Sequence, residues 1–431
     1  MSRVLFFNNT TISSDNEFDK FIWLNNHVDS SQIIEFFNQQ FPESEIYIQD
    51  RLAEVLNVNI IYKIYNSGKS ILSNDNKIAF FVANDTIAKL FEPIIKKINS
   101  EALEYKVFTP RLTSENAEGM LTSLGIDSSP ISYKKLFHFS PHCLIMANDW
   151  SGEIMLMSYL ANKTKIKTIC IQESTIDLVD KKKMRMRWTD YIFVMGINTV
   201  SQIKERNLFF ITGNPRYENL EFLKFQKLNK VFINCNFTYG IEEEHREAWM
   251  QDIISTLDFL KIDYLISKHP RDKSKLGGYK NVSESNAALV HNQLSECQLV
   301  ISRFSSIIHE SLFFGIPAIY YNPHSEEGGY DFHCDNKILF YIKNRHDLRK
   351  YIESISMNID NGNINHNAFK QYLLLNCNYL KSSKPSELIF DLLNSSINLN
   401  ISNTKNKLTF FKAFSVYILQ WLYNNYKKIK S

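Results

Sequence analysis

The residues best placed to do chemistry in this 431-residue sequence follow a short apolar run in its second half. The run Leu299–Ser302 has the composition of a buried strand, and a helical pattern, Ser305–Phe314, begins directly after it. The first turn of a helix carries unpaired backbone N–H groups and a partial positive charge, which together suit a phosphate. Ser305 and Ser306 either donate their hydroxyls to that phosphate or only cap the helix.

Two more polar side chains belong to the same stretch. Ser302 ends the strand, and Glu310 lies one turn into the helical pattern. A carboxylate at this position can accept hydrogen bonds from ribose hydroxyls; the alternative is a solvated glutamate. The stretch therefore predicts a site for a phosphorylated nucleoside.

A histidine follows another apolar run about thirty residues earlier. Lys268, His269 and Pro270 stand directly after the expected strand Tyr264–Ser267. An imidazole there can bond a phosphoryl oxygen and stabilise the charge that develops on a leaving group. The alternative is a loop histidine beside a turn proline.

Two carboxylates follow expected strands in the first half of the chain. Glu173 comes after Thr168–Ile171, and Asp149 comes after Cys143–Ala147. Either could act as a general base on a hydroxyl group. The alternatives are a helix cap for Asp149 and a solvated side chain at the start of a helix for Glu173.

These side chains need strands that end at a common edge, and the sequence pattern supplies them. Short apolar runs alternate with amphipathic stretches, which is typical of an α/β fold with parallel sheets. We expect further strands at Val4–Phe7, Glu45–Ile48, Lys77–Val82, Tyr191–Val194, Phe209–Thr212, Val231–Asn234, Ala318–Tyr321 and Ile338–Tyr341, and further helices at Gly152–Ala161, Asn198–Glu205, Glu242–Leu260 and His346–Ser356. The charged stretch 214–230 predicts a domain boundary. The expected parts are 1–220, 221–393, and a linker with a C-terminal helix at 394–431.

Composition excludes several classes of protein. Hydrophobic residues make up 44% of the chain and charged residues 22%, which is typical of a globular protein. The net charge of +3 does not call for nucleic acid as a partner. The six cysteines form no CxxC pair and no zinc-ligand spacing, so we expect buried free thiols and a cytoplasmic protein. No dense acidic motif invites a divalent ion, so we expect no metal.

Three stretches resemble GT-B glycosyltransferases of bacterial surface polysaccharide synthesis. The strand followed by Ser305-Ser306, then Glu310, then Gly315-Ile-Pro317 resembles their nucleotide-binding motif, and Lys268-His269-Pro270 is similar to the His-Pro motif of members that use cytidine-type donors. Thr168–Ser174, Trp188–Asp190 and Thr212-Gly-Asn-Pro215 resemble the end of their first domain. The group includes sialyltransferases, Kdo transferases and CDP-glycerol glycerophosphotransferases, and is related to UDP-GlcNAc 2-epimerases.

The resemblance implies two Rossmann-like domains whose parallel sheets face a central cleft. It places the donor against Lys268, His269, Pro270, Ser302, Ser305, Ser306 and Glu310, with backbone approach at Gly240. One departure is clear: relatives often carry a histidine where this chain has Gln172-Glu173-Ser174, which puts the catalytic base in doubt between Glu173 and Asp149.

The expected activity is inverting, metal-independent transfer of a sugar from a nucleotide-sugar donor, without a further cofactor. A CMP-sugar such as Kdo or a sialic acid is the first expectation for the donor, and a capsule, O-antigen or lipopolysaccharide glycan for the acceptor. The alternatives are a CDP-glycerol or CDP-ribitol transferase, a UDP-GlcNAc 2-epimerase-like enzyme, and a non-catalytic assembly subunit.

The last stretch of the sequence, Leu408–Lys430, predicts an amphipathic helix. Phe410, Phe411, Phe414, Tyr417, Ile418, Trp421 and Leu422 recur at three- and four-residue spacing. Lys412, Lys427, Lys428 and Lys430 would attract anionic lipid. We expect peripheral contact with the inner-membrane surface, where lipid-linked glycan acceptors lie; the alternative is that this face packs on the first domain.

Overall fold

The computed structural model divides the chain into two compact units. Unit 1 comprises Met1–Glu218 and Leu374–Ser431, and unit 2 comprises Asn219–Leu373. Residues 374–393, which we expected in the second domain, belong to unit 1. The structure describes residues 2–8, 18–25, 29–65, 77–112, 116–147, 149, 151–164, 166–175, 186–203, 208–238, 241–272, 274–328, 330–379, 383–394 and 409–430. Most of the expected linker lies outside these ranges.

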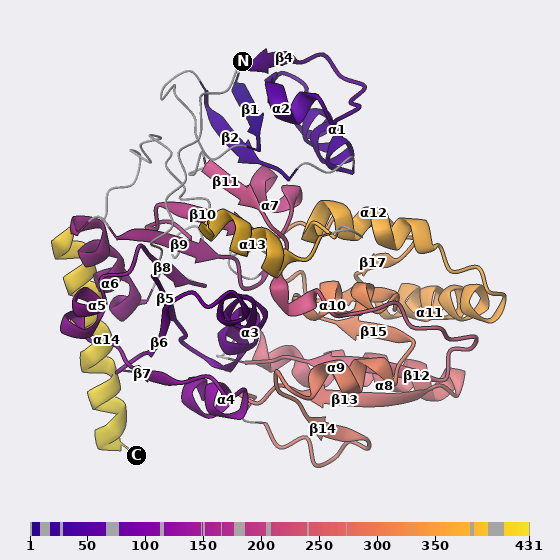
Figure 1. The fold of residues 1–431 in the computed structure, drawn as a ribbon. Helices are drawn as coiled ribbons and strands as arrows, with labels where there is room; N and C mark the ends of the chain where they lie inside the picture. The colour runs from indigo at the N-terminus through magenta and orange to yellow at the C-terminus, as the bar shows by residue number, and fades with distance from the viewer. Residues whose placement is uncertain are drawn as a thin grey trace. The chain divides into compact units, whose positions relative to one another are not determined.

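The described residues of unit 1 form an eleven-stranded sheet in which all the paired strands are parallel (Figure 1). Its spatial order is β4-β3-β1-β2-β11-β10-β9-β8-β5-β6-β7. The strands are β1 Arg3–Phe7, β2 Lys20–Trp23, β3 Glu45–Gln49, β4 Lys63–Tyr65, β5 Ile78–Phe81, β6 Tyr105–Thr109, β7 Ser128–Pro130, β8 Cys143–Met146, β9 Lys167–Ile171, β10 Tyr191–Val194 and β11 Leu208–Ile211. The seven strands expected in this part of the chain are confirmed, and β2, β4, β6 and β7 were missed.

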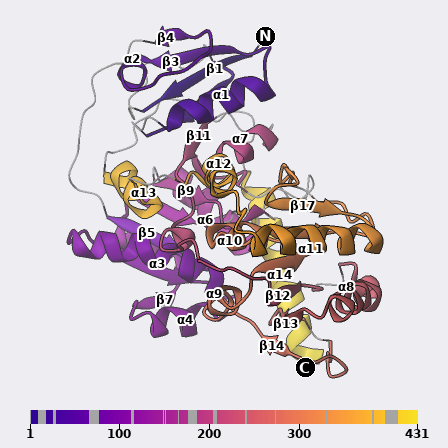
Figure 2. The same ribbon diagram turned by 90° about the vertical axis from the view of Figure 1, so that its right-hand side faces the viewer.

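The central strands of this sheet are buried because helices pack their apolar sides against it. Ile33 and Phe37 of α1 pack with Val4 and Phe6 of β1 in one core cluster, and Figure 2 shows α1 lying along the β1–β4 part of the sheet. The helices are α1 Ser30–Gln40, α2 Asp50–Ala53, α3 Asp85–Ser100, α4 Ala117–Ser123, α5 Tyr133–Phe139, α6 Gly152–Lys163, α7 Ile197–Gln202, the 3-10 turn η2 Pro215–Tyr217, α13 Pro385–Asn394 and α14 Phe410–Lys430.

Unit 2 carries a six-stranded parallel sheet in the order β14-β13-β12-β15-β16-β17. Its elements are β12 Lys230–Cys235, η3 Glu243–His245, α8 Arg246–Leu260, β13 Asp263–Lys268, β14 Val282–Glu284, α9 Val290–Ser295, β15 Leu299–Ser302, α10 Ile307–Phe313, β16 Ala318–Tyr321, β17 Leu339–Ile342 and α11 Arg345–Asp360; α12, His366–Cys377, leads back to unit 1. Trp249 and Ile253 of α8 and Leu348 and Ile352 of α11 bury one face of the sheet. The expected strands are confirmed, and only the short β14 was missed.

Both sheets reverse their strand order. In unit 2, β12 is followed by β13 on one side and β15 on the other. In unit 1, one reversal falls between β5 and β8, and another falls at β1, which lies between β2 and β3. Ligands of open α/β sheets bind in the crevice outside the carboxyl ends of the strands at such a reversal. The topology therefore predicts that ligands bind near the segments that follow β12, β15 and β8.

The chain that returns from unit 2 is locked against the strands of unit 1. Asn198 donates to Asn376 (Nδ2 to Oδ1, 2.8 Å), and Asn378 donates to the carbonyl of Ile211 (3.1 Å). A Cβ built on Gly196 would lie 2.4 Å from the backbone of Asn376, so this contact needs a residue without a side chain.

We predict that Gly196→Ala destabilises the protein by about 1–3 kcal/mol, because the added methyl group meets backbone that cannot give way. Thermal unfolding should register a loss of about 2–4 °C per kcal/mol. Gly277→Ala is the matched control, because a Cβ added there would have nothing within 4 Å. Equal melting temperatures for the two variants would contradict the close contact.

Candidate functional site

Two asparagine side chains fix the segment that follows β15. Asn234, in register with Ser302 on the neighbouring strand, donates to the Ser302 hydroxyl over 2.8 Å. Asn236 donates to the carbonyl of Phe304 over 3.1 Å. Both bonds cross from the end of β12 to the end of β15, where the strand order reverses. They hold the segment 302–306 at the sheet edge where a ligand is expected.

The three serines of this segment have different surroundings. Ser302 is fully buried and donates its hydroxyl to the carbonyl of Arg303 (2.7 Å), so it shapes the turn. Ser305 and Ser306 are half-buried, and α10 begins after them at Ile307 rather than at Ser305. Ser305 Oγ accepts from the Ile307 amide (3.3 Å), whereas Ser306 makes no side-chain cap.

His269 lies at the same edge, directly after β13. Its Nδ1 accepts a hydrogen bond from the amide of Arg271 (3.1 Å). A neutral imidazole that accepts at Nδ1 carries its proton at Nε2, so that nitrogen is the donor of the ring. His269 is half-buried.

A buried ion pair fixes the turn that carries His269. The Asp272 amide donates to the carbonyl of His269 (2.9 Å), and the Asp272 carboxylate pairs with Arg246 at the start of α8 (3.1 Å). Lys268 pairs with Glu284 of β14 (3.0 Å). We did not identify Asp272 as a positioning residue from the sequence, where it resembles any charged loop residue.

Arg303, which was not predicted from the sequence, lies in the same segment as the three serines. It is only 5% exposed, its Nε donates to Glu326 (2.8 Å), and its guanidinium lies 4.0 Å from the centre of the Phe237 ring. Burial raises the pKa of Glu326, and the neighbouring Arg303 opposes that rise. An arginine between two serines of an expected phosphate segment is the signal that could have revealed it.

The side chains of α10 are more deeply placed than expected. Glu310 is 1% exposed, and its carboxylate lies 2.8 Å from Nε2 of His291 in α9. The preceding residue, His309, is fully buried, and burial lowers its pKa to about 3, so its ring is neutral. Its Nε2 lies 3.2 Å from the Tyr372 hydroxyl. Glu310 is therefore enclosed by protein, and a histidine holds its carboxylate.

The two carboxylates of unit 1 differ in accessibility. Asp149 is fully buried and accepts hydrogen bonds from the amides of Trp188 and Thr189. These bonds hold the segment before β10 against the residues that follow β8. Glu173 is half-buried at the end of β9, and Asn214 donates to its carbonyl (3.2 Å). Glu173 is thus partly exposed, whereas protein surrounds Asp149.

Three side chains beyond β12 meet the geometric condition for a metal site. Ligand atoms of Glu242, Glu244 and His245 lie within 4.8 Å of one another. Exposed carboxylates often cluster in this way, and His245 already contacts Glu242 (3.3 Å). Gly240, the expected point of backbone approach, lies outside the described residues.

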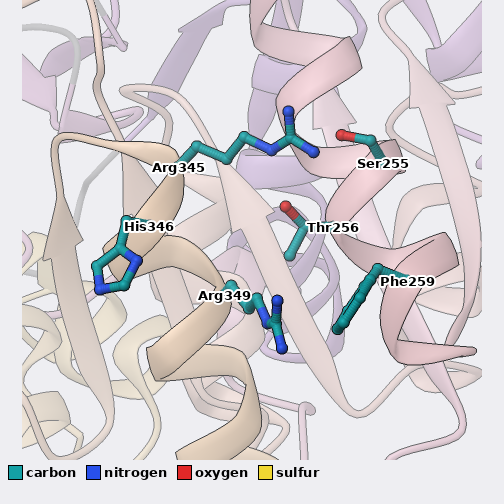
Figure 3. Close-up of a pocket in the computed structure, with 6 residues that line it drawn as sticks. All are labelled: Ser255, Thr256, Phe259, Arg345, His346 and Arg349. Carbon is teal, nitrogen blue, oxygen red and sulfur yellow. The ribbon is translucent and has the colours of Figure 1, made fainter.

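A cavity of about 350 Å³ opens on another part of unit 2, between α8 and α11 (Figure 3). Its lining includes three basic side chains of α11 together with Ser255, Thr256 and Phe259 of α8; the basic residues are Arg345, His346 and Arg349. Arg349 lies over the Phe259 ring and is paired with Glu353. None of the residues predicted for the site lines this cavity.

Known structures resemble most of the chain. The UDP co-structure of MnaA from S. aureus is 14% identical and covers 77% of this chain and 99% of its own, with a TM-score of 0.54. A protein assigned as UDP-N-acetylglucosamine 2-epimerase from Listeria monocytogenes is 12% identical, over 74% of this chain and 95% of its own, with a TM-score of 0.53. The kitacinnamycin glycosyltransferase is 11% identical, over 76% of this chain and 100% of its own, with a TM-score of 0.50.

No family model and no curated protein sequence matches the chain. The likeness is therefore one of fold. The chain has the GT-B fold, an α/β architecture with two Rossmann-like parallel sheets, and carries an additional C-terminal helix.

Proposed function

We propose that this chain is a glycosyltransferase that moves a sugar from a nucleotide donor onto a glycan. The observation that carries the proposal is the edge of the unit 2 sheet at the strand reversal. Asn234 and Asn236 hold the serine segment there, and His269 follows the adjacent strand. Hydroxyls, an imidazole N–H and a buried arginine are the groups that bind a phosphate without a metal.

In this proposal the donor is a CMP-sugar, such as Kdo or a sialic acid. The support is the Lys268-His269-Pro270 motif, together with the proton at His269 Nε2 that follows from its hydrogen bond at Nδ1. The acceptor is a growing capsule, O-antigen or lipopolysaccharide glycan. Glu310, held by His291, accepts hydrogen bonds from the ribose hydroxyls. Ser305 and Ser306 donate hydrogen bonds to phosphate oxygens.

The proposed reaction is one displacement with inversion at the anomeric carbon. Glu173 takes the proton of the acceptor hydroxyl, whose oxygen then forms the new glycosidic bond. The bond from the anomeric carbon to the phosphate oxygen breaks, and CMP leaves with the electron pair. His269 and Arg303 stabilise the charge that appears on the phosphate. Asp149 is the weaker candidate for the base because the protein surrounds it.

UDP-GlcNAc 2-epimerisation is the second candidate function. It is favoured by the fold likeness to a structure that holds UDP and to a protein assigned as an epimerase. A CDP-glycerol or CDP-ribitol transferase would use the same histidine and serines, and a non-catalytic subunit would bind nucleotide without turnover.

We predict that one class of nucleotide raises the melting temperature of the purified protein. The screen compares CMP, CDP, UDP, TDP and GDP. A ligand that binds only the folded protein, at 100 times its Kd, raises the free energy of unfolding by about 2.7 kcal/mol. The corresponding sugar nucleotides are then tested for hydrolysis and transfer. Stabilisation by CMP supports the proposal; stabilisation by UDP with conversion of UDP-GlcNAc to its 2-epimer would replace it with the second candidate.

We predict that His269→Ala lowers turnover of the preferred donor at least about tenfold with an unchanged melting temperature, because it removes a charge-assisted contact to the leaving phosphate. His346→Ala, an exposed histidine beside the separate cavity, is the matched control and should keep full activity. Equal turnover in the two folded variants would remove His269 from the site.

We predict that Glu173→Gln binds the donor with nearly native affinity but transfers at least about 100-fold more slowly, because an amide cannot act as a base. Calorimetric titration of the donor and single-turnover transfer give the two quantities. Glu54→Gln, at an exposed position of unit 1, is the control. If Asp149→Asn abolishes transfer and Glu173→Gln does not, the base is Asp149.

A further inference from the structure

The C-terminal helix α14 exposes most of its aromatic side chains. Seven apolar residues between 41% and 80% exposed form what we call the outer face: Phe411, Phe414, Leu419, Trp421, Leu422, Tyr423 and Tyr426. A soluble monomer rarely leaves so many large apolar side chains together in water. The expected helix is confirmed, but its apolar side is not buried against the protein.

The opposite side of α14 holds the helix to unit 1 through small and polar groups. Ala413 is fully buried beside Met155 and Trp188, and a Cβ on Gly152 would lie 2.6 Å from the Cα of Tyr417. Two polar contacts extend this side, from the Glu153 amide to Gln420 (3.2 Å) and from Asn424 to the carbonyl of Leu112 (3.2 Å). Figure 1 shows α14 running beside α6. An amphipathic surface helix usually turns its large apolar side chains inward, whereas most of those on α14 are exposed.

The stretch of sequence that contains this helix carries only positive charge. Residues 392–431 contain six lysines and no aspartate or glutamate, which leaves 43 basic and 46 acidic residues in the rest of the chain. The positive excess of the protein is therefore concentrated in its last forty residues. Lys412 lies within α14, and Lys427, Lys428 and Lys430 fall in its last turn.

We propose that α14 lies flat on an anionic lipid surface, with the outer face in the headgroup region and the positive charge of residues 392–431 attracting lipid phosphates. Tryptophan and tyrosine suit that region because each combines an apolar ring with a polar group. Among the described residues no helix is long and apolar enough to cross a bilayer. The contacts of Gln420, Asn424 and the backbone beside Gly152 keep the outer face turned away from unit 1.

This position has a consequence for the substrate, which rests on the proposed glycosyl transfer. The contacts of α14 reach the first residues of α6, which follow β8, and Leu112, which follows β6. Both lie at the carboxyl edge of the unit 1 sheet, the edge at which β9 leads into Glu173. A helix lying on lipid would bring this edge towards the membrane, so the acceptor class that fits is a glycan carried by a membrane lipid.

Co-sedimentation with vesicles tests the proposal on the full chain without nucleotide. We expect at least about tenfold tighter binding to phosphatidylcholine vesicles containing about 30% phosphatidylglycerol than to phosphatidylcholine alone, and weaker binding at high salt. The double variant Phe411→Ser, Leu422→Ser should lose at least about tenfold in binding and keep its melting temperature, since both side chains are exposed. The matched control, Phe259→Ser with Met357→Ser, removes comparably exposed side chains of unit 2 and should bind as the native chain does.

Equal and weak binding to both vesicles, or native binding by the Phe411/Leu422 variant, would overturn the proposal. Sedimentation equilibrium tests whether a second copy of the chain covers this face instead. If the native chain is a dimer, the Phe411/Leu422 variant is a monomer and neither binds vesicles, the outer face is a dimer interface. Vesicle binding by a protein that turns over no nucleotide sugar would sink the proposed transfer and its acceptor, but leave the lipid contact standing.

Discussion

A hydrogen bond between two neighbouring parallel strands, from Asn234 to the hydroxyl of Ser302, organises the candidate site. It lies where the strand order of unit 2 reverses. At such a reversal the connections that leave neighbouring strands run to opposite sides of the sheet, which creates a crevice at the carboxyl ends of the strands. The hydroxyl of Ser302 in turn donates a hydrogen bond to the carbonyl of Arg303, which fixes the next residue of the segment. The serine segment thus has a fixed conformation before any ligand arrives, which lowers the cost of ordering it on binding.

Paired charges complete this edge. Arg303 is held between Glu326 and the Phe237 ring, Glu310 is held by His291, and Asp272 ties the histidine turn to Arg246. An unpaired charge at such depth would be expensive, so each partner holds the other in place. A site arranged in this way can stabilise charge on a phosphate with little reorganisation.

The C-terminal helix follows a different physical logic. Its contact with α6 combines close backbone approach at Gly152 with a small apolar cluster around Ala413, and most of its aromatic side chains remain exposed. Sequence periodicity revealed the apolar face, but it gives no direction in space. Both interpretations of that face, packing and lipid contact, were compatible with the same spacing; the packed helix shows that the described part of the protein does not cover it.

The sequence alone determined the α/β class, nearly all the central strands and the strand ends that bear Ser305, His269 and Glu173, because buried parallel strands are continuous apolar runs with polar residues where they stop. It missed β4, β7 and β14, which are strands of three residues at or near the sheet edges, and also β2 and β6 within the sheet. Only the tertiary structure decided that residues 374–393 return to unit 1, that Asp149 is enclosed while Glu173 is not, and that Arg303 lies beside the serine segment. These facts depend on contacts between residues far apart in the chain. A local sequence pattern does not specify which distant residue packs against a given side chain.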